Sequence, residues 1–170
     1  MPPHGVESYA PIGSAVGPSG STPPLRPCNV RAVADDVVDI LARLTLFADL
    51  GRPQLESVAH TFEEEMFQEE QRILRQGLAG SNFYVILDGE AAVRVDGRDL
   101  ATLGRGDFFG EVSVLLGEPP TADVVATRSM RCLVLPGSEV EPFLTSHPKV
   151  LFRMLQAEAR RLRATIQWQS

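Results

Sequence analysis

The sequence predicts an α+β protein in which a small antiparallel β-barrel lies between N-terminal and C-terminal helices. Changes in the spacing of apolar residues lead to this expectation. Residues 33–61 show helical spacing, residues 64–136 break into short runs separated by Gly and Asp, and helical spacing returns after Glu139. Apolar residues recur about every 3.6 positions on one helix face and every second position in a strand. Several short strands at such intervals are typical of a sandwich or barrel.

Composition places the chain among globular proteins. Its 170 residues suffice for one domain with a hydrophobic core. The net charge of −6 disfavours a general nucleic-acid-binding surface, and neither a membrane-spanning apolar run nor a signal peptide is visible. The two cysteines, Cys28 and Cys132, lie far apart in the chain. We therefore expect a reduced, cytoplasmic protein without a membrane or nucleic-acid partner.

The first part of the chain differs from the rest. Residues 1–30 contain seven Pro, four Gly and four Ser. Such a segment buries too little apolar surface to offset the entropy lost on ordering. We predict a disordered arm over residues 1–32 and a folded domain over residues 33–170.

Two helices are expected before the barrel. An acidic pair, Asp35 and Asp36, suits a helix start. The apolar residues that follow with helical spacing are Val37, Ile40, Leu41, Leu44 and Leu46. A second, shorter helix is predicted over residues 53–61, with Pro53 in its first turn.

The barrel strands are predicted from short β-rich runs. These runs are residues 83–87, 91–95, 100–103, 124–127 and 131–135. The pairs Asp88-Gly89 and Asp96-Gly97 follow the first two runs, and Asp-Gly is a strong hairpin signal. The last two runs are expected to pair with each other.

Two helices are predicted after the barrel, one before His147 and a final one of about 20 residues. An apolar stripe runs along the final helix at Leu151, Leu155, Leu162 and Ile166. Packing of this stripe on its own barrel is the simpler expectation, and packing across a dimer is the alternative. The arginines at 153, 160, 161 and 163 are interpreted as a solvated face, although one of them reaching a ligand is left open.

Four segments in this order resemble motifs of the cyclic nucleotide-binding domain family, which includes catabolite-activator-type regulators, kinase regulatory subunits and gated channels. The segments are residues 46–50, 75–77, 83–90 and 104–111. The resemblance covers residues 38–165 and implies a jelly-roll-like barrel with flanking helices. It also implies a cyclic nucleotide, cAMP or cGMP, as ligand.

The residues after the fourth segment carry the predicted site. Gly110 allows close approach of the backbone to a ligand because it has no Cβ. A short helix over residues 111–116 presents backbone N–H groups at its N-terminus, which suit an anion. The predicted ligand-binding residues are Phe109, Gly110, Glu111, Val112, Ser113, Pro120, Thr121 and Ala122.

The resemblance implies a role for most of these residues. Glu111 would accept a hydrogen bond from the ribose 2′-hydroxyl. The N–H groups of Val112 and Ser113 would face the sugar-phosphate. The Thr121 hydroxyl and the Ala122 N–H would donate to a phosphate oxygen.

Two positions, Pro120 and Asp123, depart from the family pattern. The family reads Pro-Arg-Thr/Ala-Ala where this chain reads Pro119-Pro120-Thr121-Ala122, so Pro120 stands where an arginine is expected. A charge-assisted hydrogen bond contributes about 1.5–3 kcal/mol, so its loss weakens binding about 10- to 150-fold. Asp123 either faces the same pocket, where it would repel an anion, or points to solvent. Arg105 and Arg128 are the candidates for a substitute charge, and a surface position is the simpler interpretation of each.

The functional prediction is a non-enzymatic sensor that binds cAMP or cGMP and regulates a protein partner, with affinity weakened by Pro120. The alternatives are a degenerate domain that acts as an interaction scaffold, or a fragment of a transcription regulator. A homodimer or another protein partner would meet the C-terminal helix. The three histidines are too scattered in sequence for a predicted metal site, and no nucleophilic triad or cofactor motif is apparent.

Overall fold

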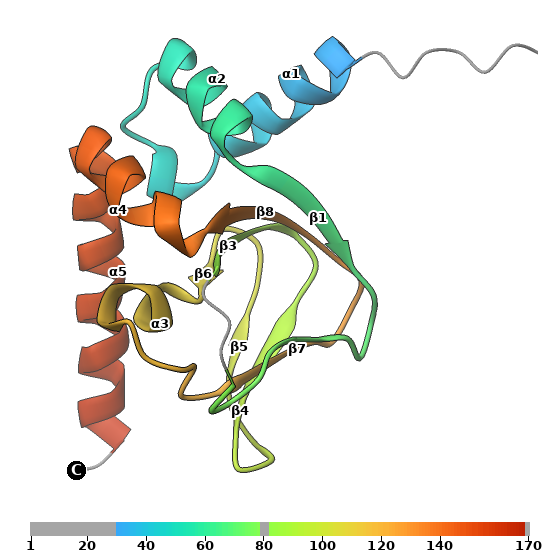
Figure 1. Cartoon of the computed structure of the whole chain (residues 1–170), viewed down its shortest axis with the longest axis vertical. Helices are drawn as coiled ribbons and strands as arrows, with labels where there is room; N and C mark the ends of the chain where they lie inside the picture. The colour runs from blue at the N-terminus through green and yellow to red at the C-terminus, as the bar shows by residue number, and fades with distance from the viewer. Residues whose placement is uncertain (1–29, 79–81, 169–170) are drawn as a thin grey trace, which may run out of the picture.

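The computed structural model describes residues 30–78 and 82–168 (Figure 1). The predicted arm of residues 1–32 lies almost wholly outside them, and Cys28 does too. The elements before the last strand are α1 (Val30–Leu41), η1 (Thr45–Phe47), α2 (Arg52–Thr61), β1 (Glu63–Phe67), β2 (Arg72–Leu74), β3 (Asn82–Asp88), β4 (Ala91–Val95), β5 (Arg98–Leu103), β6 (Phe108–Phe109), α3 (Glu111–Leu116) and β7 (Asp123–Ala126). The chain ends with β8 (Met130–Pro136), α4 (Gly137–Ser146) and α5 (Pro148–Trp168).

The N-terminal helical region is split. The first predicted run of helical spacing covers two elements, because α1 ends at Leu41 and Leu46 belongs to the short helix η1. Leu44 lies in the connection between them, and both leucines are buried. The turn brings α2 back against α1. The second predicted helix is confirmed as α2, with Leu55 and Val58 buried.

The strands form two four-stranded antiparallel sheets in a jelly-roll-like arrangement, which confirms the predicted α+β fold class. One sheet has the order β1-β8-β3-β6, and the other has the order β2-β7-β4-β5. The Asp96-Gly97 hairpin is confirmed between β4 and β5. Asp96 and Gly97 both have positive φ, 51° and 77°, as a two-residue turn of this kind requires.

Two predicted pairings are wrong. The Asp88-Gly89 turn does not close a hairpin, because β3 and β4 belong to different sheets. The runs that form β7 and β8 do not pair with each other either: β7 lies between β2 and β4, and β8 lies between β1 and β3. At Gly89 a Cβ would lie 2.4 Å from the Ser129 carbonyl oxygen, so the crossing between sheets requires glycine.

Strand β3 separates two layers of the core. Its odd-numbered residues Phe83, Val85 and Leu87 pack with the helices, whereas Tyr84 and Ile86 pack between the two sheets. Alternation of side chains across a strand explains this division, and it shows why the run is apolar throughout. Cys132 lies in the layer between the sheets, where burial raises its pKa to about 12 and keeps the thiol protonated.

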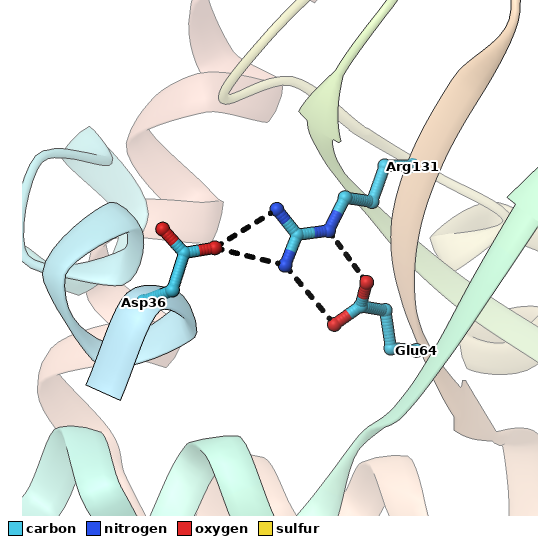
Figure 2. A network of polar contacts seen from close by, with 3 residues as sticks. All are labelled: Asp36, Glu64 and Arg131. Carbon is cyan, nitrogen blue, oxygen red and sulfur yellow. Dashed lines mark hydrogen bonds and ion pairs between the residues drawn. The ribbon is translucent and has the colours of Figure 1, made fainter. Parts of the chain in front are cut away.

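An ion-pair network joins α1 to the first sheet (Figure 2). Arg131 on β8 donates from Nε and Nη2 to the two carboxylate oxygens of Glu64 on β1, at 2.5 and 3.2 Å. Its two terminal nitrogens each lie 3.1 Å from Asp36 Oδ2 on α1. Glu64 therefore forms an ion pair with Arg131. The arrangement fixes α1 over the edge of the sheet.

The final helix packs with a face that differs from the predicted one. Val150 and Met154 are buried, and Ala157 packs on the same core. Arg153 anchors the helix near η1, with Nε and Nη2 donating to the Asp49 carboxylate at 2.6 and 3.0 Å. The predicted stripe is exposed on α5, so its packing on the chain's own barrel is wrong. Among the described helices, α5 included, none is long and apolar enough to cross a membrane.

Candidate functional site

A cavity of about 770 Å³ opens between the second sheet, α3, residues 120–122 and α5. The structure brings all eight predicted site residues to its wall. Leu74, Val93 and Leu103 contribute apolar surface from the sheet, and Arg161, Ala164 and Thr165 contribute from α5. The final helix thus covers part of a site whose other wall comes from residues 109–122.

Gly110 directs the chain from β6 into α3. Its φ of 86° lies in the left-handed region, and a Cβ there would come 2.2 Å from the Asn82 carbonyl oxygen. No other residue fits this close approach without a backbone shift. Phe109 stacks on Tyr84 with ring centroids 4.7 Å apart and nearly parallel planes. These two constraints place Glu111, Val112 and Ser113 at the cavity wall.

Glu111 is a buried carboxyl group with one unsatisfied oxygen. Its exposed fraction is 5%. Oε1 accepts a hydrogen bond from Arg161 Nη1 at 3.0 Å, whereas Oε2 is buried and has no partner among the described residues. Burial raises the pKa of Glu111 to about 7, and the Arg161 charge opposes this rise. The cavity wall therefore holds an acceptor that lacks a donor.

Arg161 is the only lysine or arginine among the residues that line the described cavity. It reaches across from α5, where Nη1 also contacts Glu158 Oε1 at 2.8 Å and Nη2 donates to the Phe108 carbonyl at 2.6 Å. Its guanidinium lies 4.4 Å from the centre of the Phe108 ring. Its interpretation as part of a solvated face is thus wrong. The sequence does contain a signal for this position: Arg161 follows Val150, Met154 and Ala157 at helical spacing, which places it on the buried face of α5.

Pro120 lies at the cavity wall and is buried. It has no N–H to offer a ligand, and its carbonyl accepts a hydrogen bond from Gly77 N at 2.8 Å. Neither Arg105 nor Arg128 lines the cavity, so neither takes the position of the missing arginine. Where the family pattern has a cation, this chain presents an apolar ring.

Asp123 does not line the cavity. Its Oδ1 accepts a hydrogen bond from Gln76 N at 2.8 Å, and its Oδ2 lies 3.6 Å from Arg72 Nε. The carboxylate therefore holds the turn after β2. The alternative in which Asp123 faces the pocket is therefore wrong.

Residues 64–147 match the protein family described as cyclic nucleotide-binding domain. A cGMP-dependent protein kinase of Toxoplasma gondii is 31% identical over 119 residues, which cover 70% of this chain and 12% of the kinase. The crystal structure of a cyclic nucleotide-binding domain from Methylobacillus flagellatus has a TM-score of 0.68 at 25% identity and covers 80% of this chain and 82% of its own. The catabolite activator protein of Thermus thermophilus has a TM-score of 0.66 at 27% identity, over 72% of this chain and 60% of its own.

The chain belongs to the cyclic nucleotide-binding domain family, as its sequence motifs predicted. It spans about an eighth of the length of the T. gondii kinase that it matches. The same fold occurs in the regulatory subunit of a cAMP-independent protein kinase A from Trypanosoma brucei, with a TM-score of 0.68 at 20% identity, over 81% of this chain and 50% of that chain.

Proposed function

We propose that this chain is a regulatory module that binds a cyclic nucleotide in the cavity and passes its occupancy to a protein partner through α5. The buried Oε2 of Glu111 carries this proposal. An acceptor without a donor costs free energy, which a ligand hydroxyl at the cavity wall would recover. A ribose 2′-hydroxyl is such a donor. The role is regulatory, and we propose no catalytic step.

The size and lining of the cavity fit the rest of such a ligand. A volume of about 770 Å³ lies within the usual range for small-molecule sites, and apolar side chains from the sheet would contact a flat base. Val112, Ser113, Thr121 and Ala122 offer N–H or hydroxyl donors for the sugar-phosphate. The Methylobacillus flagellatus relative is itself described as a cyclic nucleotide-binding domain.

The electrostatics of the cavity favour weak binding. Arg161 is engaged by two carboxylates, Glu111 and Glu158, so little of its charge is free for a phosphate. Pro120 provides no compensating charge. We expect an affinity about 10- to 150-fold below that of a site with the loop arginine.

The same observations favour a second candidate function. A domain that lacks the loop arginine, and in which one oxygen of Glu111 is already bound by Arg161 of its own helix α5, fits an interaction scaffold without tight nucleotide binding. A fragment of a transcription regulator is a further alternative. The N-terminal domain of such a regulator from Streptomyces coelicolor is 31% identical, covers 76% of this chain and 93% of its own, and has a TM-score of 0.57.

Titration calorimetry with cAMP, cGMP and 2′-deoxy-cAMP tests the proposal. We expect weak binding of a cyclic nucleotide, a loss of about tenfold or more for 2′-deoxy-cAMP, and a similar loss for Glu111→Ala with cAMP. The deoxy analogue and cAMP should bind Glu111→Ala equally, because the acceptor is absent. Glu118→Ala, at an exposed glutamate just after α3, is the matched control. No heat at millimolar concentrations of either natural nucleotide would contradict the sensor and favour the scaffold.

A further inference from the structure

The charges around the cavity do not suit an anion. Among the described residues that line it, the charged side chains are Asp107, Glu111 and Arg161. Glu158 brings a further carboxylate to the cavity wall, because its Oε1 lies 2.8 Å from Arg161 Nη1. Carboxyl groups therefore outnumber cations at this wall. A ligand phosphate would add negative charge where the described part of the chain already has an excess of it.

Arg161 is bound by partners of its own chain. Nη1 donates to Glu111 Oε1 and to Glu158 Oε1, and Nη2 donates to the Phe108 carbonyl. The guanidinium also lies 4.4 Å from the centre of the Phe108 ring. To pair with a phosphate, Arg161 would have to leave these partners, and Glu111 would then be buried without a compensating charge. Breaking a buried ion pair in this way is strongly unfavourable.

The loop side of the cavity is better suited to an uncharged group. Pro120 is buried there and presents an apolar ring, and its carbonyl is bound by Gly77 N. A phosphate oxygen placed against this ring would lose water without gaining a donor from it, and such a loss is costly. A hydroxymethyl group would lose no hydrated charge. The neighbouring Thr121 hydroxyl both donates and accepts, so it suits a ligand hydroxyl.

The rest of the cavity suits a sugar and a base. Oε2 of Glu111 is buried at the wall without a partner among the described residues. A ribose hydroxyl both donates and accepts, so it fits this carboxyl group in either protonation state, which matters because burial raises the pKa of Glu111 to about 7. An anionic oxygen fits only the protonated group. Leu74, Val93 and Leu103 offer apolar surface for a flat base.

We propose that the preferred ligand of the cavity is an uncharged ribonucleoside, with a ribose hydroxyl at Glu111 Oε2 and no phosphate at Pro120. The inference rests on the proposed function, because it uses the same cavity and the same acceptor, but it changes the class of ligand from an anion to a neutral molecule. A cyclic nucleotide occupies the same place more weakly. The loop that lacks an arginine then selects against a phosphate, in addition to binding it poorly.

Titration calorimetry of the full chain with adenosine, guanosine, cAMP and cGMP tests the ligand class. We expect at least one nucleoside to bind about tenfold or more tightly than its cyclic nucleotide, because no phosphate has to be desolvated. The 2′-deoxy form of that nucleoside should bind about tenfold less tightly than the nucleoside itself. If both cyclic nucleotides bind at least as tightly as their nucleosides, the inference is overturned and the proposed function stands. Absence of binding by all four at millimolar concentrations would overturn both.

The role of charge is tested by one variant and by one ligand. Pro120→Arg should change the affinity for the nucleoside by less than about twofold while that for its cyclic nucleotide rises about tenfold or more, because only the latter carries a phosphate. Pro119→Arg, at an exposed position off the cavity, is the matched control and should keep the wild-type preference. With the wild type, the uncharged methyl ester of cAMP should bind more tightly than cAMP. An unchanged preference in Pro120→Arg, or an ester that binds no more tightly than cAMP, would overturn the charge argument.

Discussion

Glu111 is a carboxyl group that folding removes from water while leaving one of its oxygens without a donor. Burial raises its pKa from 4.5 to about 7, so the folded chain holds this proton more tightly than the unfolded chain. The free energy of unfolding must therefore fall as pH rises from about 4.5 to about 7, and level off above. Titration of this one group lowers the free energy of unfolding by an amount on the order of 3 kcal/mol.

Removing the ionisable group should remove this pH dependence. We expect Glu111→Gln to show a smaller difference in the free energy of unfolding between about pH 5 and about pH 8 than the wild type shows. Urea denaturation at the two pH values measures it. Glu118→Gln, at an exposed glutamate, should behave as the wild type does. Equal pH dependence in Glu111→Gln and the wild type would show that Glu111 is not the titrating group.

Pro120 is the residue on which nucleotide affinity should depend most. We expect Pro120→Arg to increase the affinity for cAMP about tenfold or more, because a guanidinium at the cavity wall gains a charge-assisted hydrogen bond to the phosphate. Calorimetry measures the change. Pro119→Arg is the matched control, because Pro119 is exposed and does not line the cavity. An equal gain in both variants would indicate a general charge effect instead of a phosphate contact.

At the scale of elements, α5 is attached unevenly. Its N-terminal half is held by Val150, Met154 and the Arg153–Asp49 ion pair. Beyond Ala157 the described side chains are exposed or half-buried. Arg161 nevertheless joins this half to β6 and α3 through the Phe108 carbonyl and Glu111. The second half of the helix is thus the part whose position a ligand at Glu111 would affect.

The attachment through Arg161 is testable by hydrogen exchange. We expect Arg161→Met to speed amide exchange in residues 158–166 about tenfold or more, because hydrogen bonds from a charged donor are lost. Residues 150–157 should keep their protection, since their contacts are unchanged. Arg160→Met, one residue away and exposed, is the matched control. If exchange in residues 158–166 is the same in all three proteins, other contacts hold this half of the helix.

At the scale of the whole molecule, Phe62 joins the helical layer to the sheets. Its ring makes edge-on contacts with Phe143 at 5.0 Å, Phe83 at 6.3 Å and Phe47 at 6.5 Å between centroids. These partners come from α4, β3 and η1, which are distant in sequence. Aromatic pairs of this geometry add to the burial of their surface. The rings therefore connect a helix before the strands and a helix after them with β3 in the core.

Loss of this ring should destabilise the entire domain. We expect Phe62→Ala to lower the free energy of unfolding by about 3–5 kcal/mol, because it leaves a cavity where three elements meet. Met66→Ala, at a side chain 60% exposed on the next strand, should change it by less than about 0.5 kcal/mol. Chemical denaturation followed by circular dichroism measures both. Similar losses in the two variants would contradict the central role of Phe62.

Local sequence signals were sufficient for the fold class, the family and the wall of the cavity. Apolar spacing predicted α2, the Asp96-Gly97 pair predicted the β4–β5 hairpin, and the family-like motif at Gly110 predicted the short helix α3. Each of these depends on residues close in the chain. The motif around Gly110 predicted the residues that the structure places at the cavity, although their contacts with a ligand stay a prediction. The spacing of apolar residues indicates which face of an element is buried, and turn residues indicate where the chain reverses direction.

Only the tertiary structure decided what each buried face meets. The Asp88-Gly89 turn connects strands of different sheets, and β7 and β8 also belong to different sheets. Local sequence did not predict this because strand pairing depends on partners far away in the chain. The same reason applies to α5, where two apolar stripes are present and the sequence alone does not say which one packs inward. Because Val150 and Met154 form the inner face, Arg161 lies at the cavity wall, and Leu155 and Leu162 are exposed. Local sequence thus determined most of the elements and the loop that forms the cavity wall. Long-range packing determined which charged side chain lies in the cavity.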